Sequence, residues 1–192
     1  MENNVTISAK RRTIVHITLI ALFAALTAAG TFIAIPLPFS PVPIVLQNLF
    51  ALLSGLLLGP LLGGAAVGLY LIAGAIGAPV FAGATGGFVR FLGPTGGFLF
   101  GYLFAAMVAG CIAGSPRSAY KTPLWRIILG AIGGLLVVYV PGITWLKVML
   151  DKTWQEALVM GCLPFILGDA LKGVVAVIIA PRLRRAVADI IP

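Results

Sequence analysis

The chain has 192 residues, of which 60% are hydrophobic and 9% are charged, and its mean hydropathy is +1.13. Soluble domains carry about 25% charged residues, so these apolar side chains exceed what a core of this size can bury. The composition excludes an ordinary soluble domain and predicts an all-α integral membrane protein. The net charge of +8 does not indicate nucleic-acid binding, because nine of the thirteen Lys and Arg residues flank apolar segments in three short groups.

The first apolar run covers residues 13–35 and follows three basic residues, Lys10 to Arg12. It meets the length of about 20 residues that a membrane-spanning helix needs. It is also longer than the apolar part of a signal peptide, which has about 7–15 residues, so we expect a helix that stays in the membrane. Residues 36–43 (PLPFSPVP) contain four prolines and cannot be helical, because proline lacks the N–H group. We expect an apolar, packed loop there.

Five further helices follow, which predicts a single membrane domain over residues 1–192 with six transmembrane helices. These helices are expected at about residues 44–60, 61–77, 96–114, 123–149 and 157–187. A glycine-rich segment, residues 78–97, separates the third helix from the fourth and contains TGGF twice. We expect Pro141 to kink the fifth helix and Pro164 to bend the sixth near its start.

Six spans place both termini on the same side of the membrane, and the basic residues assign that side to the cytoplasm. The groups on this side are Lys10, Arg11 and Arg12; Arg117, Lys121 and Arg126; and Arg182, Arg184 and Arg185. The opposite side holds Arg90, Lys147 and Lys152, which are partly offset by Asp151 and Glu156. An excess of Lys and Arg marks cytoplasmic loops, so the distribution predicts a multi-pass protein with both termini inside.

The proline loop (36–43) and the glycine-rich segment (78–97) then both lie on the outer face. Non-helical backbone near a bilayer persists only where it is buried in protein or lines a cavity. Two such segments on one face favour a lid over a pocket, and ordinary packed connections are the alternative.

Small residues recur every four positions on the first helix, at Ala21, Ala25 and Ala29. This spacing lets two helix backbones approach closely. It indicates either packing within the chain or docking on another membrane protein.

Two opposite charges, Asp169 and Lys172, interrupt the apolar stretch FILGDALKGV of the sixth helix. Residues three apart share a helix face, so the two side chains are expected to point the same way. A lone charge in mid-membrane costs from about 3 to more than about 10 kcal/mol and marks a pathway or site by default. A self-neutralising structural pair is the alternative hypothesis.

The other candidate polar groups are few. Gln47 and Asn48 open the second helix, and Thr85 and Arg90 lie in the glycine-rich segment. Aromatic residues that can supply apolar walls are Phe39, Phe81, Phe88 and Tyr139.

Several kinds of chemistry have no sequence support. There is no Gly-Lys-Ser/Thr phosphate loop, so ATP hydrolysis by this chain is not expected. His16 is the only histidine, and no cluster of His, Cys and carboxylates indicates a metal site. No arrangement of nucleophile, base and orienting group suggests covalent catalysis. A substrate-binding membrane protein is the leading class, followed by a membrane enzyme and then by a pure assembly subunit. A transporter of some other type that carries a small polar solute is a further alternative.

Three segments together resemble the BioY family, the biotin-binding S components of energy-coupling factor (ECF) transporters. They are PLPFSPVPIVLQNLFALLSGLLLGP (36–60), GAPVFAGATGGFVRFLGPTGG (77–97) and PFILGDALKGVVA (164–176). The resemblance implies a six-helix bundle of the S-component type in a prokaryotic cell membrane. It also implies that biotin is the transported ligand, with no cofactor, and lies near the outer face beneath the two loops.

The resemblance further implies partners and residue roles. A transmembrane T component, coupled to two cytoplasmic ATPases, would dock on the small-residue face of the first helix. The acid and lysine of the Gly-Asp-x-x-Lys element, Asp169 and Lys172 here, are associated with the ligand in relatives. Thr85 stands where some relatives carry asparagine. Biotin offers two ureido N–H donors, a ureido carbonyl and a carboxylate, and these groups suit a carboxylate acceptor with Lys172 or Arg90 as the cation.

Overall fold

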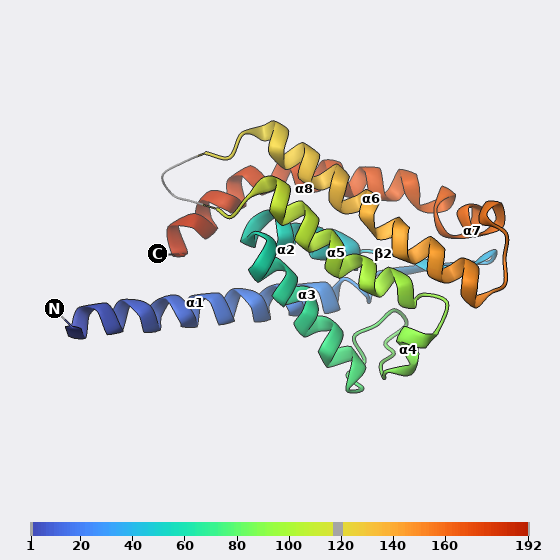
Figure 1. Ribbon diagram of the computed structural model, residues 1–192, viewed down its shortest axis with the longest axis horizontal. Coiled ribbons are helices and arrows are strands. Elements are labelled where there is room, and N and C mark those ends of the chain that lie inside the picture. Colours follow the sequence, from blue (N-terminus) through green and yellow to red (C-terminus); the bar gives the residue numbers. More distant parts are fainter. Residues whose placement is uncertain (1, 117–120, 192) are drawn as a thin grey trace.

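The computed structural model (Figure 1) describes residues 2–116 and 121–191 and is an elongated bundle of helices. Arg117, one of the predicted cytoplasmic cations, lies outside the described residues. The two ends of the chain lie at the same end of the bundle (Figure 1). The helices are α1 (Glu2–Ala29), α2 (Gln47–Leu58), α3 (Pro60–Ala75), α4 (Val89–Leu92), α5 (Gly96–Ala113), α6 (Leu124–Met149), α7 (Trp154–Gly161) and α8 (Leu163–Ile190).

Within the described residues, four helices are long and apolar enough to cross a membrane by length and composition: α1 from Lys10 onward, α5, α6 and α8. Helices α2 and α3 are apolar but shorter, with 12 and 16 residues. At 1.5 Å per residue they reach only about 18 and about 24 Å. The all-helical membrane character is therefore supported, and the count of six spans stays a prediction.

Helix α2 lies at the centre of the bundle and packs against α1, α3, α5, α6 and α8. All but one of its twelve residues are buried, including the polar side chains of Gln47 and Asn48 at its first turn. A helix that is apolar on every side is expected in the middle of a bundle. The two polar residues are thereby fixed in the interior, where their hydrogen-bonding groups need partners.

The proline-rich segment differs from the predicted loop. Helix α1 ends at Ala29 rather than near residue 35, and strands β1 (Ala34–Leu37) and β2 (Ser40–Val45) form an antiparallel hairpin. Prolines can occupy an isolated two-stranded hairpin because each strand leaves one edge without ladder partners. The Ser40 hydroxyl at the turn donates a 2.7 Å hydrogen bond to the Met160 carbonyl of α7. The hairpin is thus fixed across the end of the bundle opposite the termini.

The glycine-rich segment is folded back onto the bundle. Phe81 and Thr85 exchange backbone hydrogen bonds, and α4 follows at Val89–Leu92. Phe81 is buried and its ring packs edge-to-face against both Tyr70 and Phe91. Phe91 also packs against Phe100 of α5, so this aromatic cluster anchors the segment on α3 and α5.

Helix α6 runs without interruption through Pro141. The predicted sixth helix is instead two helices, α7 and α8, because the backbone leaves helical geometry at Cys162. Pro164 lies in the first turn of α8, a position where its missing N–H removes no helical hydrogen bond. The break precedes the proline, and α7 folds beside the ends of α6 and β2.

Glycines let α5 approach its neighbours closely. A Cβ atom added at Gly101 would lie 2.8 Å from the Val138 carbonyl oxygen of α6, and one at Gly55 of α2 would collide with the Ala106 backbone of α5. Such contacts bring helix backbones together in a membrane, where packing rather than water exclusion drives association. These glycines serve packing within the chain.

The alanines of α1 divide between two faces. Ala21, Ala25 and Ala29 are exposed, whereas Ala24 is buried in the core. The predicted small-residue face therefore points away from the rest of this chain.

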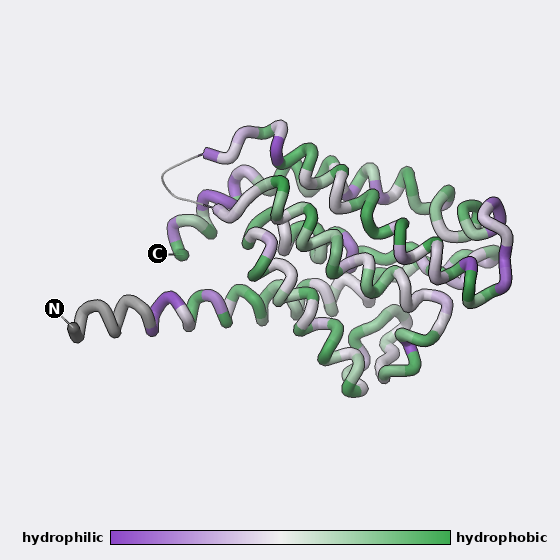
Figure 2. The backbone as a smooth tube through the Cα atoms, in the orientation of Figure 1, coloured by the Kyte–Doolittle hydropathy of each residue, from purple (hydrophilic) through white to green (hydrophobic). Residues whose placement is uncertain are grey.

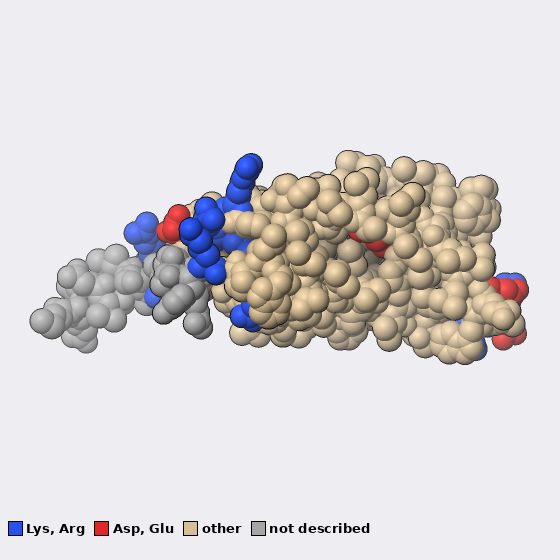
Figure 3. Space-filling view, turned by 90° about the horizontal axis from the view of Figure 1, so that it is seen from above, with Lys and Arg blue, Asp and Glu red and all other residues tan. Residues whose placement is uncertain are grey.

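Hydrophilic residues gather mainly at the two ends of the bundle, and hydrophobic residues cover its length (Figure 2). Lys and Arg side chains gather at the end that carries the termini, and the opposite end shows a mixture of acids and bases (Figure 3). An acidic patch is also visible in a hollow of the otherwise uncharged middle of this face (Figure 3).

Candidate functional site

A buried carboxylate, that of Asp169, is the centre of a hydrogen-bonded cluster between three helices. Its Oδ1 accepts hydrogen bonds from Asn48 Nδ2 at 2.8 Å and from Lys172 Nζ at 2.9 Å. Its Oδ2 accepts one from the Tyr139 hydroxyl at 2.6 Å. Helices α2, α6 and α8 each supply part of this cluster, so the site forms only when the bundle is assembled.

The ion pair between Asp169 and Lys172 is largely shielded from solvent, with side-chain exposures of 10% and 11%. Two buried charges are tolerated when they are paired and their remaining polar atoms are bonded. The additional donors from Asn48 and Tyr139 meet this condition for the acid. Lys172 has one bonded proton and keeps donor capacity for another acceptor, because an ammonium group has three donors.

Asn48 leaves one polar atom unsatisfied. Its Oδ1 is buried and has no hydrogen-bond partner among the described residues. Buried polar groups are nearly always bonded, so this acceptor, on a residue that lines a cavity, is open to a donor from a water or a ligand.

Two adjoining cavities lie beneath the hairpin. The carboxylate cavity is narrow, with about 20 Å³ of room, and its polar lining includes Asn48, Tyr139, Asp169 and Lys172. The loop cavity has about 40 Å³ of room, and its polar lining includes Gln47, Thr85 and Arg90. Both are partly open to the outside. They share five lining residues, which are Val42, Pro43, Val45, Phe98 and Tyr102. Binding pockets of small molecules are mostly apolar with a few placed polar groups, and the two linings have this character.

The polar residues of the loop cavity are bonded in part. Gln47 Oε1 accepts a 3.3 Å hydrogen bond from the Tyr70 hydroxyl, and the Thr85 hydroxyl donates to the Ala82 carbonyl at 3.0 Å. Arg90 is exposed and pairs with no acid of residues 10–116 or 121–191. The loop cavity therefore presents one free cation.

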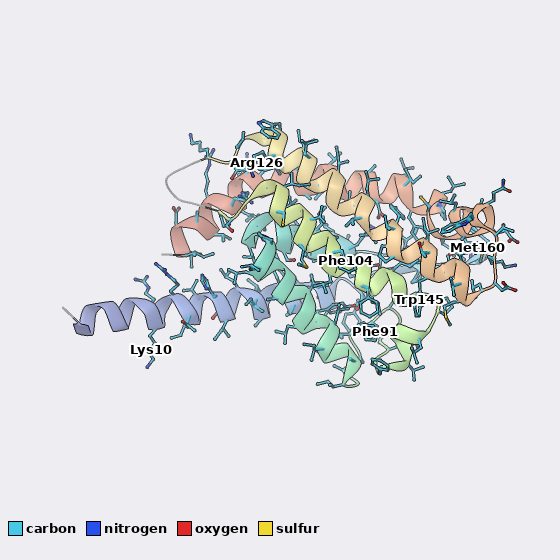
Figure 4. All side chains as sticks on the ribbon, in the orientation of Figure 1. Lys10, Phe91, Phe104, Arg126, Trp145 and Met160 are labelled. Atoms are coloured by element: carbon cyan, nitrogen blue, oxygen red, sulfur yellow. The ribbon has the colours of Figure 1, made fainter. Side chains whose placement is uncertain are left out.

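The glycine-rich segment is tied to α6 beside this cavity. The Trp145 indole nitrogen donates a 2.9 Å hydrogen bond to the Gly93 carbonyl. Trp145 and Phe91 lie near each other at this end of the bundle (Figure 4). This end of the segment is thus held in place independently of any ligand.

Seven of the nine predicted ligand-binding residues line one of the two cavities. Asp169, Lys172 and Tyr139 line the carboxylate cavity, and Gln47, Thr85, Phe81 and Arg90 line the loop cavity. The structure does not bring the other two there: Phe39 and Phe88 are exposed by 58% and 64% and line neither cavity. Phe39 lies in the hairpin turn, and Phe88 stacks on Phe91 at the surface.

Several lining residues were not predicted from the sequence. Tyr102 and Phe98 of α5 and Phe165 of α8 lie in apolar helices, where an aromatic residue gives no sign of facing a cavity. Tyr102 offered the one usable signal, because a tyrosine inside a membrane helix needs a polar partner or a polar surface for its hydroxyl. No group of three or more His, Cys, Asp or Glu side chains clusters within the described part of the chain, so no residues there are assigned to a metal.

The fold and the site define a multi-pass helical membrane protein with a small, charged pocket buried between its helices. The chain belongs to the BioY family, whose pattern it matches over residues 1–189. The family predicted from the three sequence segments is thereby confirmed.

Among its relatives, the "probable biotin transporter BioY" of Pyrococcus horikoshii is 43% identical and is aligned over 88% of this chain and 96% of its own length. The "biotin transporter BioY" of Thermotoga maritima is 39% identical, over 85% of this chain and 92% of its own length. The crystal structure of an S-component for biotin from an ECF-type ABC transporter superposes with a TM-score of 0.79 and 31% identity. That match covers 90% of this chain and 92% of the other. These relatives are named as transporters or a transporter component, which agrees with the prediction that the chain is not an enzyme.

Proposed function

We propose that this chain is the biotin-binding S component of an ECF transporter. The observation that carries the proposal is the buried carboxylate of Asp169. It lines a cavity and accepts hydrogen bonds from donors on three helices. The family and the names of its relatives supply the ligand, because the same fold can serve other solutes. In this role the chain uses no cofactor, and biotin is its transported substrate.

The polar lining of the carboxylate cavity matches the ureido ring of biotin, and the cavity must widen to admit the ring because it now has about 20 Å³ of room. A carboxylate has about four lone-pair sites, and three donors occupy Asp169, so one acceptor position is open to a ureido N–H. Asn48 Oδ1 is a second acceptor nearby and suits the other N–H. Lys172 then donates one of its remaining protons to the ureido carbonyl. Each polar group of the ureido ring then has a hydrogen-bond partner: its two N–H groups have acceptors, and its carbonyl has a donor.

The lining of the loop cavity matches the rest of biotin, and this cavity, with about 40 Å³ of room, must also widen to admit it. The walls shared by the two cavities are mainly apolar and suit the sulfur-containing ring and the valeryl chain. The valerate carboxylate then reaches Arg90, the free cation of the loop cavity, and Thr85 and Gln47 offer polar contacts beside it. Phe81 forms an apolar wall. Phe39 and Phe88 retain a role only if the loops close further over the ligand.

The same proposal extends to the membrane and to the partners. Both termini lie in the cytoplasm of a prokaryotic-type cell, and α1, α2, α3, α5, α6 and α8 cross the cell membrane as one domain. A transmembrane T component docks on the exposed face that includes Ala21, Ala25 and Ala29 of α1. Two separate cytoplasmic ATPases supply the energy. The end with most of the cations supports this orientation, since positive charge accumulates on the cytoplasmic side.

Titration calorimetry of the purified protein tests the function. Biotin and desthiobiotin, which shares the ureido ring, should both bind saturably, and biotin amide should bind more weakly than biotin because it lacks the carboxylate. The absence of saturable binding by a correctly folded protein would overturn the proposal. Chemical conversion of the ligand would instead identify the chain as a membrane enzyme.

A further inference from the structure

A second polar cavity, the basic cavity, lies at the other end of the bundle, between the end of α5 and the start of α6. It has about 330 Å³ of room, is partly open to the outside, and its polar lining is Ser115, Lys121, Thr122 and Arg126. Arg126 stands at the first turn of α6, near the end of the bundle that carries the termini (Figure 4). The proposed biotin site does not use any of these residues.

The lining of this cavity has donors and positive charge without a matching acid. Arg126 Nε donates to the Ile112 carbonyl at 2.8 Å, and the other two nitrogens of its guanidinium have no partner among the described residues. Lys121 is exposed and forms no ion pair with the described acids. The hydroxyls of Ser115 and Thr122 lie in the same wall. The arrangement suits an anion with several acceptor oxygens.

A buried guanidinium supports the wall from behind. Arg184 of α8 is only 4% exposed and donates through one nitrogen to the Gly114 carbonyl and the Thr122 hydroxyl, both at 2.9 Å. It also bonds the Leu56 carbonyl of α2, and its Nε has no partner among the described residues. No carboxylate neutralises it in the part of the chain described. Arg184 therefore fixes the wall of the cavity and adds a third positive charge beside it.

The position of the cavity matches the headgroup layer of a membrane. Trp125, next to Arg126, is 60% exposed, and tryptophan is enriched where a bilayer meets water. Basic pockets between helices on the cytoplasmic side are suited to anionic lipid headgroups. We propose that the basic cavity binds a phosphate group, that of an anionic phospholipid headgroup, through Lys121 and Arg126 with the Ser115 and Thr122 hydroxyls.

The full chain, purified in neutral detergent, allows a direct test by thermal unfolding and native mass spectrometry. Dioctanoyl phosphatidylglycerol should raise the unfolding temperature saturably, because a ligand that binds only the folded state stabilises it. Dioctanoyl phosphatidylcholine at the same concentration should not, because its headgroup carries no net charge. An equal effect of inorganic phosphate would assign the cavity to free phosphate, and no effect of either anion would overturn the proposal.

Two double variants distinguish binding of the lipid in the basic cavity from general attraction of an anionic lipid to positive charge. The first double variant combines Lys121→Gln and Arg126→Gln, and the second combines Arg182→Gln and Arg185→Gln at exposed positions of α8. Each removes two positive charges. Phosphatidylglycerol should bind the first variant at least about tenfold more weakly and the second nearly as well as the wild type. Equal losses in both variants would overturn the proposal. Lys121→Glu, which breaks no hydrogen bond among the described residues, repeats the test if the Arg126 variant does not fold.

Discussion

The Tyr139 hydroxyl of α6 donates a 2.6 Å hydrogen bond to Oδ2 of Asp169 in α8, while Asn48 of α2 donates to the other oxygen. The carboxylate thus joins three helices before any ligand arrives. It has about four lone-pair sites and three protein donors, since Lys172 is the third. Asp169 is accordingly both a structural residue and a candidate ligand group, and its variants must separate the two roles.

Asp169→Asn should weaken biotin binding by about 10- to 100-fold. The change keeps the size of the side chain but replaces an acceptor-only group with an amide, and a charge-assisted hydrogen bond contributes about 1.5–3 kcal/mol. Calorimetry on the folded variant measures the loss. Unchanged affinity would remove Asp169 from the site.

The same variant leaves Lys172 without its partner, and an uncompensated buried charge costs about 3–5 kcal/mol of stability. Asp169→Asn combined with Lys172→Met removes both charges and serves as the control for folding. If the double variant regains the unfolding temperature but still fails to bind biotin, the pair is a ligand site. Recovery of both stability and binding would make it a structural pair only.

Asn48→Leu should weaken biotin binding by about tenfold or more, because it removes the unpaired acceptor at similar side-chain volume. The two mono-N-methyl isomers of biotin sharpen the test, since each lacks one ureido N–H. The wild type should discriminate against the isomer that cannot donate to Asn48, and the variant should not. Equal loss of affinity for biotin and both isomers would mean that Asn48 only positions Asp169.

Arg90→Gln should abolish most of the preference for biotin over biotin amide. Arg90 is exposed, so its pairing with the valerate is expected to contribute only about 0.2–1 kcal/mol, or a factor of about 1.5 to 5. Lys152→Gln is the control, because it removes one partly exposed positive charge, paired with Glu156, outside the cavities. A preference that survives in Arg90→Gln, or falls equally in both variants, would contradict a contact between Arg90 and the carboxylate.

The sequence predicted local relationships well. The spacing of Asp169 and Lys172 indicated a shared helix face, and the 2.9 Å ion pair agrees with it. The meeting of Asp169 with Asn48 was not predictable, because it joins residues 121 positions apart and depends on how α2 and α8 are rotated about their axes. Local periodicity carries no information about that rotation when helices are apolar on every side.

The hairpin shows the same limit from another direction. The four prolines within residues 36–43 correctly excluded a helix, but they do not indicate whether the segment forms a hairpin with itself. The pairing of Ala34 with Val45 depends on the turn around Phe39 and on the anchor from Ser40 to α7. That hydrogen bond requires α7 to be a separate helix from α8, and the sequence did not predict this break.

Ala25→Leu should reduce biotin uptake by cells while biotin binding by the purified protein stays unchanged. Ala25 is exposed on α1, so the larger side chain blocks close approach of a partner helix without filling space in this chain. Ala24→Leu is the matched control on the buried face and should lower stability by about 1–3 kcal/mol through overpacking. Loss of purified binding in Ala25→Leu would indicate packing within the chain rather than docking.

The glycine-rich segment should become ordered over bound biotin. Its two ends are fixed, by the packing of Phe81 on Tyr70 and by the hydrogen bond from Trp145 to Gly93. Between them, the Gly87 N–H donates to the Gly74 carbonyl of α3 at 2.7 Å, while Gly83 and Gly87 adopt positive φ angles of 75° and 96° and Val89 is 76% exposed, so the stretch is held at few points. Ordering it costs about 1–2 kcal/mol per residue, which contacts with the ligand must offset.

Hydrogen exchange with and without biotin measures this ordering. Amides from Ala82 to Arg90 should become more protected when biotin is present, because they cover the loop cavity. Amides of α6 near Arg126 should change little, since they lie at the other end of the bundle (Figure 4). Trp145→Phe provides a further comparison: loss of the hydrogen bond to Gly93 should speed exchange of the free protein and leave the biotin-dependent difference larger. Equal protection of the segment with and without biotin would show that the pocket is formed before the ligand arrives.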